Sequence, residues 1–138
     1  MKTGLFWFVA LFAAAFNLFS LYDLYGTTTN FEEHLAGYPP AFVEMILNFP
    51  EWRRILWATT VFIGVIGAIA LLLRRSLAER ALWAATILLI LAVILDYTML
   101  DGAVGYAHAG IGFNLLIVAI EALFALYAGY ARRQGMLR

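Results

Sequence analysis

Residues 109–131 read AGIGFNLLIVAIEALFALYAGYA, a stretch in which Glu121 is the only charged side chain. Its length is close to the roughly 20 residues that an α-helix needs to cross the hydrocarbon core of a bilayer. Three further stretches of similar length and character precede it, at residues 4–22, 55–73 and about 81–100. The sequence therefore predicts an all-α fold, an integral membrane four-helix transmembrane bundle that forms a single domain over residues 1–138.

The composition favours the same class of protein and excludes several others. Hydrophobic residues make up 64% of the chain and charged residues 13%, compared with about 45–50% and about 25% in soluble domains, so the lipid bilayer is the expected surrounding. The formal net charge is zero, which argues against a nucleic-acid partner. The absence of cysteine excludes disulfides, thiolate catalysis and cysteine-ligated metals.

The distribution of basic residues predicts how the chain is threaded. Seven of the nine fall on one side of the expected bundle and only Arg53 and Arg54 on the other. Because basic residues concentrate in cytoplasmic segments, both termini are expected in the cytoplasm, and the acidic residues lie mostly on the outer side. The seven are Lys2, Arg74, Arg75, Arg80, Arg132, Arg133 and Arg138.

The outer loop, residues 24–54, is the longest segment outside the expected spans. Asn30 followed three residues later by Glu33 is typical of a capping box at a helix start, and Gly37 of a helix end. Pro39 with Pro40 favours the start of a second short helix. That helix would be amphipathic and would either rest on the membrane surface or form a lid over the mouth of the bundle. Its apolar side carries Phe42, Met45, Ile46 and Phe49, and its polar side Glu44 and Asn48.

Each expected span also carries a stripe of small or polar residues at helical spacing. Helices in lipid pack through such residues because lipid gives no hydrophobic drive for association, so the stripes are expected to face one another inside the bundle. They are Ala10, Ala13, Ala14, Asn17 and Ser20 in the first span, Thr60, Gly64, Gly67 and Ala68 in the second, Ala81, Ala85, Ala92 and Asp96 in the third, and Gly110, Asn114, Glu121, Ala125 and Ala128 in the fourth.

Six polar side chains in or beside the spans form the candidate ligand or proton site. Glu121 would lie about 18 Å below the start of the last span, near the bilayer midplane, where an ionised carboxylate costs about 2.5–3.5 kcal/mol on insertion scales. It is expected either to be neutral and donate to Asn17 or Asn114, or to bind a ligand, proton or cation. Asp23 and Asp96 would lie at the outer boundary, where each can pair with Arg53 or Arg54. The six are Asn17, Asp23, Asp96, His108, Asn114 and Glu121.

The chain gives little support for a metal site or an enzyme. His108 and His34 are the only histidines, and although they could join an acid around zinc, neither has a second histidine at ligand spacing, so no metal is expected. No phosphate-binding loop, nucleophile elbow or other catalytic motif is present, and no cofactor is indicated.

Some local sequences resemble a known group of proteins. Residues 16–19 (FNLF) followed by Asp23, residues 49–52 (FPEW), and Gly64 through Arg74 and Arg75 are similar to parts of uncharacterised four-helix bacterial inner-membrane proteins, some of which carry an automatic sugar-transporter label. The resemblance covers the first two spans best. It implies a bacterial inner-membrane location and no defined activity.

Three classes of function follow from these observations. The first is a small unit that binds or transports a small or lipophilic molecule through an outward-facing polar cavity floored by Glu121. Transport would require a homodimer, because four helices leave little lumen. The second is an accessory subunit of a larger membrane complex. The third is an enzyme acting on a lipid or quinone, with Glu121 or Asp96 as acid or base, and it ranks last because no nucleophile and base are paired.

Overall fold

The structure is a computed structural model that describes residues 2–138, and over those residues it is all-helical, with 82% helix and no strand. Four helices are long and apolar enough to cross a membrane, which confirms the predicted fold class at that level. The helices are α1 (Lys2–Thr29), α2 (Phe31–His34), α3 (Pro40–Leu47), α4 (Glu51–Leu72), α5 (Leu77–Met99), α6 (Gly102–Gly105) and α7 (Gly110–Arg133).

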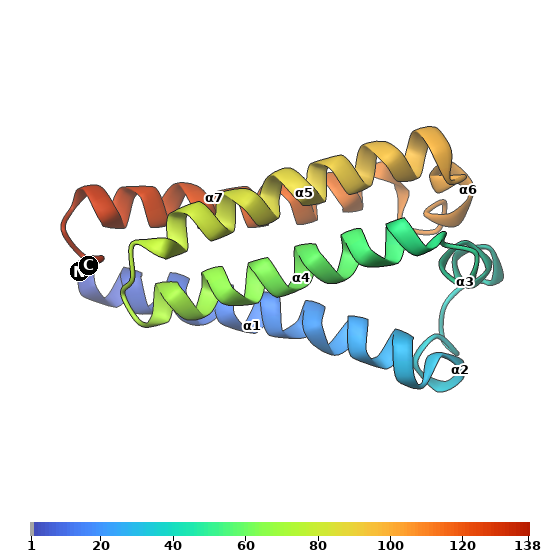
Figure 1. Cartoon of the computed structure of the whole chain (residues 1–138), viewed down its shortest axis with the longest axis horizontal. Helices are drawn as coiled ribbons and strands as arrows, with labels where there is room; N and C mark the ends of the chain where they lie inside the picture. Colours follow the sequence, from blue (N-terminus) through green and yellow to red (C-terminus); the bar gives the residue numbers. More distant parts are fainter. Residues whose placement is uncertain (1) are drawn as a thin grey trace.

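The four long helices lie side by side in alternating directions (Figure 1). Contacts are most extensive between α4 and α5, then between α5 and α7 and between α1 and α4, whereas α1 and α7 touch much less. Both chain ends lie at one end of the bundle, here called the terminal end, and α2, α3 and α6 lie at the other, the loop end. Toward the loop end α1 diverges from the other long helices.

Small residues form the contact faces of the bundle, as the stripes predicted. All residues of the predicted stripes are buried except Ser20, Thr60 and Gly110, which are half-buried. At Gly67 an added Cβ would lie 2.8 Å from Leu82 Cγ, so the absence of a side chain allows α4 and α5 to pack closely. Large apolar side chains such as Phe8, Phe19 and Ile87 face outward, where a bilayer would cover them.

The C-terminal tail closes the terminal end. It turns back after α7 and hydrogen-bonds to the link between α4 and α5, with the Arg138 amide donating to the Arg74 carbonyl and the Ser76 amide to the Arg138 carbonyl, each at 2.7 Å. Leu137 is buried among core side chains that include Phe6 and Leu71. The tail is therefore part of the folded bundle.

The first long connection differs in part from its prediction. Helix α1 continues past Tyr22 to Thr29, so Asp23 lies within a helix. The Asn30 amide donates to the Glu33 carboxylate at 2.7 Å and the Asn30 side chain caps no backbone amide, so the expected capping box does not form. Helix α3 begins at Pro40, as the proline pair predicted.

Candidate functional site

A polar pair lies in the middle of the bundle, between α1 and α7. The Asn17 amide donates to Glu121 Oε2 at 3.4 Å and to the Ala13 carbonyl of its own helix at 3.0 Å. Both side chains are buried, with exposed fractions of 4% for Asn17 and 3% for Glu121. Of the two partners that the sequence suggested for Glu121, the structure selects Asn17, but with the Asn17 amide as donor and the carboxyl group as acceptor, the reverse of the predicted direction.

The third helix at this point, α4, contributes Gly64. A Cβ added to Gly64 would collide with Asn17 Oδ1 and would lie 3.6 Å from Glu121 Oε1. The lack of a side chain therefore lets the polar pair lie directly against the α4 backbone. The small-residue stripe predicts only helix packing for Gly64, and no signal in a single sequence connects it to Asn17 or Glu121.

Within residues 2–138, Glu121 has no countercharge, because the ion pairs there join other carboxylates, those of Asp23, Asp96 and Glu79. Glu121 Oε1 is buried and has no hydrogen-bond partner in the described part of the chain. Since a buried charge without a partner is costly, protonation of this carboxyl group, or contact of its free oxygen with a water, a cation or a ligand donor, would stabilise it.

Aromatic side chains close the α1–α7 contact on the terminal side of the polar pair. Phe12 and Phe16 of α1 meet Phe124 of α7 edge to face, with ring centroids 5.5 and 5.6 Å apart. Nearer the terminal end, the rings of Phe6 and Tyr127 lie 6.4 Å apart. Toward the loop end α1 diverges from the other long helices (Figure 1), and there Leu24 of α1 packs with Val61 and Val65 of α4.

Asp96, at the loop end of α5, belongs to a different arrangement. Arg53 of α4 donates to both of its oxygens, from Nε at 2.5 Å and from Nη2 at 2.8 Å, and the Tyr106 hydroxyl donates to Oδ2 at 2.9 Å. The Arg53 guanidinium also lies over the Phe49 ring, 4.6 Å from its centroid. Asp96 and Arg53 are 1% and 6% exposed, so this is a buried ion pair with satisfied carboxylate oxygens, which fits the structural role considered for Asp96.

Tyr106 and Tyr97 extend this arrangement to α7. Their rings stack with centroids 5.8 Å apart, and the Asn114 amide donates to the Tyr97 hydroxyl at 3.1 Å. Asn114 is therefore engaged at the loop end and not with Glu121. Burial, and secondly the Asp96 carboxylate, raise the pKa of the Tyr106 phenol well above its ordinary value.

Asp23 pairs with His34 and with neither Arg53 nor Arg54. Asp23 Oδ1 lies 2.7 Å from His34 Nε2, and the imidazole packs against Gly26, where any Cβ would collide with it. The expectation failed because α1 diverges from α4 toward the loop end (Figure 1), while Arg53 binds Asp96 and Arg54 donates to the Leu47 carbonyl. The contact holds α2 against the end of α1.

The predicted lid residues cover part of the loop end. Met45 and Ile46 are buried, Phe42 is half-buried and Glu44 is exposed, and the apolar three belong to a cluster with Trp57 of α4 and Tyr106. His108 lies among aromatic rings, 5.2 Å from Phe42 and 6.4 Å from Tyr38 between centroids. Within the described residues no group of three potential metal ligands occurs.

The six predicted site residues thus separate into distinct groups. Asn17 and Glu121 meet at the centre, Asp96 and Asn114 lie in the loop-end network, Asp23 pairs with His34, and the exposed His108 lies beside the rings of Phe42 and Tyr38. Two hollows, of about 650 Å³ at the terminal end and about 490 Å³ beside α3 and α6, are lined by other residues, and Glu121 lines neither.

Comparison with known proteins adds no assignment. No known protein family, curated protein or solved structure matches the chain. The residues and their arrangement are therefore the basis for any function.

Proposed function

We propose that this is a small polytopic protein of the bacterial inner membrane that binds a small or lipophilic molecule at the polar pair, with Glu121 exchanging a proton. The observation that carries the proposal is the carboxyl group of Glu121, buried in the middle of the bundle and, among residues 2–138, uncompensated and with one oxygen unpartnered. Ionisable groups at such depth usually mark proton, ion or substrate sites.

The position of the pair supports access from the loop end. Aromatic contacts between α1 and α7 lie on its terminal side, and the divergence of α1 lies on its loop side. Helix α3 and its apolar residues Met45 and Ile46 cover the loop end and would act as the lid. In this proposal a molecule reaches Asn17 and Glu121 between α1 and α7.

The orientation proposed for the bundle rests on charge. The terminal end carries Lys2 and the arginines that follow α4 and α7, whereas the loop end carries most of the acidic residues. By the preference of basic residues for the cytoplasm, the termini face the cytoplasm and the loop end faces outward. A reporter fused after Arg138 should then be active in the cytoplasm, and one inserted between Ala36 and Pro39 should be active outside.

The decisive experiment follows the protonation of Glu121. Infrared spectra of the protein in liposomes, recorded at about pH 6, where exposed carboxyl groups are already ionised, and at an alkaline pH, should show a carboxylic-acid carbonyl band that disappears as the pH rises. Glu121→Gln should lack this band change, and Glu51→Gln, the same chemical change at an exposed site of α4, should keep it. Identical band changes in the parent and Glu121→Gln would show that Glu121 does not titrate and would overturn the proposal.

Binding can be followed with tetraphenylphosphonium as a lipophilic cationic probe. Because a probe cation and a proton would compete for the same carboxyl group, the parent should bind the probe more tightly at alkaline pH. Glu121→Gln should lose that pH dependence while Glu51→Gln retains it. Equal, pH-independent binding by all three proteins would place the probe elsewhere on the protein.

A further inference from the structure

The terminal end carries a groove that the proposed function does not use. This terminal groove has a volume of about 650 Å³ and runs along one face of α5 beside the end of α7, lined by residues that include Glu79, Arg80, Trp83, Ala84, Ile87 and Arg132. It lies at the opposite end of the bundle from α2, α3 and α6. Binding of a ligand in this groove would therefore not depend on Glu121.

The lining changes from charged to apolar along α5. Arg80, Ala84 and Ile87 follow one another at helical spacing, and Ile87 lies about 10 Å farther from the terminal end than Arg80 at 1.5 Å per residue. Trp83 lies between them, half-buried against the core, and tryptophan is a residue typical of the membrane interface. The groove is thus charged at the terminal end and apolar farther along α5. A phospholipid has the same order, with a charged headgroup followed by apolar acyl chains.

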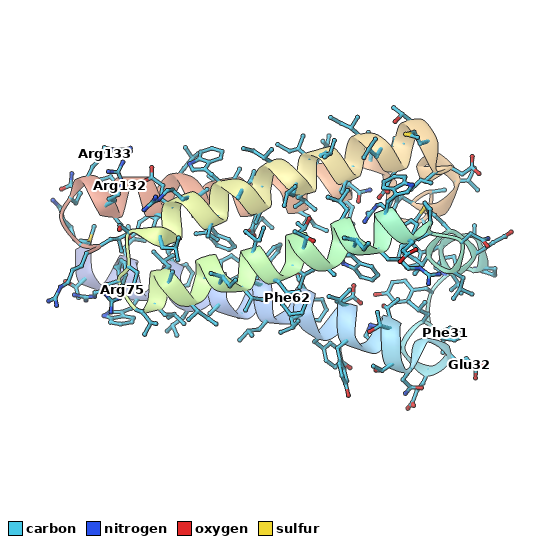
Figure 2. The ribbon with its side chains drawn as sticks, in the orientation of Figure 1. Phe31, Glu32, Phe62, Arg75, Arg132 and Arg133 are labelled. Atoms are coloured by element: carbon cyan, nitrogen blue, oxygen red, sulfur yellow. The ribbon has the colours of Figure 1, made fainter. Side chains whose placement is uncertain are left out.

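The charges in the groove leave a cationic excess. Glu79 forms an ion pair with Arg132 and rests on Gly129, whose added Cβ would lie 2.8 Å from Glu79 Oε1. Arg80 is exposed and takes part in no ion pair of residues 2–138. The two arginines of the groove thus outnumber its one acid. Figure 2 shows Arg132 at this end of the bundle together with Arg75 and Arg133, which do not line the groove.

We propose that the terminal groove binds an anionic phospholipid from the surrounding bilayer. The headgroup phosphate lies between Arg80 and the free amino groups of the Arg132 guanidinium, and one acyl chain follows Trp83, Ala84 and Ile87. Basic pockets between membrane helices bind such headgroups. A zwitterionic lipid fits less well because its cationic group would meet the same arginines.

The test measures lipid retained by the whole protein. Delipidated protein in detergent is incubated with dioleoylphosphatidylglycerol or dioleoylphosphatidylcholine, and bound lipid is counted by native mass spectrometry. The parent should retain the anionic lipid preferentially, and Arg80→Gln should weaken its binding about fivefold, the effect expected for one arginine near a lipid surface. Arg75→Gln, which removes an exposed arginine outside the groove lining, should leave retention unchanged.

A second variant tests the apolar floor. Ala84→Phe fills the groove without changing its charge, so it should reduce retention of the anionic lipid while the protein keeps its helical content by circular dichroism. The proposal is overturned if the two lipids are retained equally, if Arg80→Gln and Arg75→Gln behave alike, or if Ala84→Phe retains lipid as the parent does. Displacement of the lipid by inorganic phosphate alone would also overturn it, because the site would then recognise a free anion.

Discussion

The buried pair of Arg53 and Asp96 should contribute more to stability than any other ionic contact among residues 2–138. Asp96→Asn keeps the shape of the side chain but removes its charge, and the Arg53 guanidinium, 6% exposed, then lies buried without a countercharge. Breaking a buried pair in this way costs about 3–5 kcal/mol. The Tyr106 hydroxyl can still donate to the amide oxygen of the asparagine. The lost stability therefore comes mainly from the unpaired charge of Arg53.

Two further variants separate this charge effect from packing. Arg53→Met combined with Asp96→Leu removes both charges and leaves only the Tyr106 hydroxyl unpartnered, a cost of about 1–3 kcal/mol. The double variant should therefore be more stable than Asp96→Leu alone. Arg54→Met is the matched control, because Arg54 is exposed and donates a single hydrogen bond to the Leu47 carbonyl at 3.0 Å, and its effect should stay within about 0.5 kcal/mol.

The free energies can be measured by reversible unfolding in mixed micelles of a mild detergent and dodecyl sulfate, followed by near-ultraviolet circular dichroism. From most to least stable, we expect the order parent, Arg54→Met, double variant, Asp96→Asn. If Asp96→Asn and Arg54→Met were equally stable, the two hydrogen bonds between Arg53 and Asp96 would not hold the loop end together. If the double variant were less stable than Asp96→Leu alone, the penalty would come from lost packing and not from an unpaired charge.

Two other predictions concern Gly64 and Tyr106. Gly64→Ala should cost about 1–3 kcal/mol by overpacking and disturb the Asn17 side chain, which the new Cβ would meet; Gly112→Ala, where a Cβ meets nothing within 4 Å, should be neutral or stabilising in the same unfolding assay. The folded state retains the Tyr106 proton above pH 10.0, the ordinary pKa, whereas the unfolded chain releases it, so the contribution of Tyr106 to stability should be constant below that pH and fall as the pH rises beyond it. Tyr106→Phe should abolish this alkaline decline in a pH series of unfolding curves, and an unchanged decline would contradict the assignment.

The sequence predicted the long helices well because the signals for them are local. Length and apolar character define the four long helices, and small residues such as Ala13, Gly67 and Ala85 show which faces meet. The proline pair at Pro39 likewise predicted the start of α3. These features depend only on residues close together in the chain. A single sequence is therefore enough to predict them.

The candidate site was predicted less completely because its contacts join distant segments. Nothing in the sequence says that Arg53 reaches Asp96 while Arg54 does not, since that depends on the rotation of α4. The extension of α1 to Thr29 was missed because Tyr22 and Asp23 look like the end of an apolar span, although the helix continues beyond it. Helix α2 packs back against that extension, so that His34 meets Asp23.

The two buried carboxylates of the bundle differ in a way that bears on function. Asp96 shows how this chain stabilises a structural carboxylate, with two hydrogen bonds from an arginine and one from a tyrosine. Glu121 is almost as buried, yet within residues 2–138 it receives a single long hydrogen bond from an amide and keeps one oxygen unpartnered. Replacing it with leucine or glutamine would be the simpler choice for packing alone, because an unpartnered acid in a helix bundle lowers stability. In the function proposed for this protein, a bound proton or ligand offsets that cost at Glu121, whereas Asp96, with both oxygens hydrogen-bonded, needs neither.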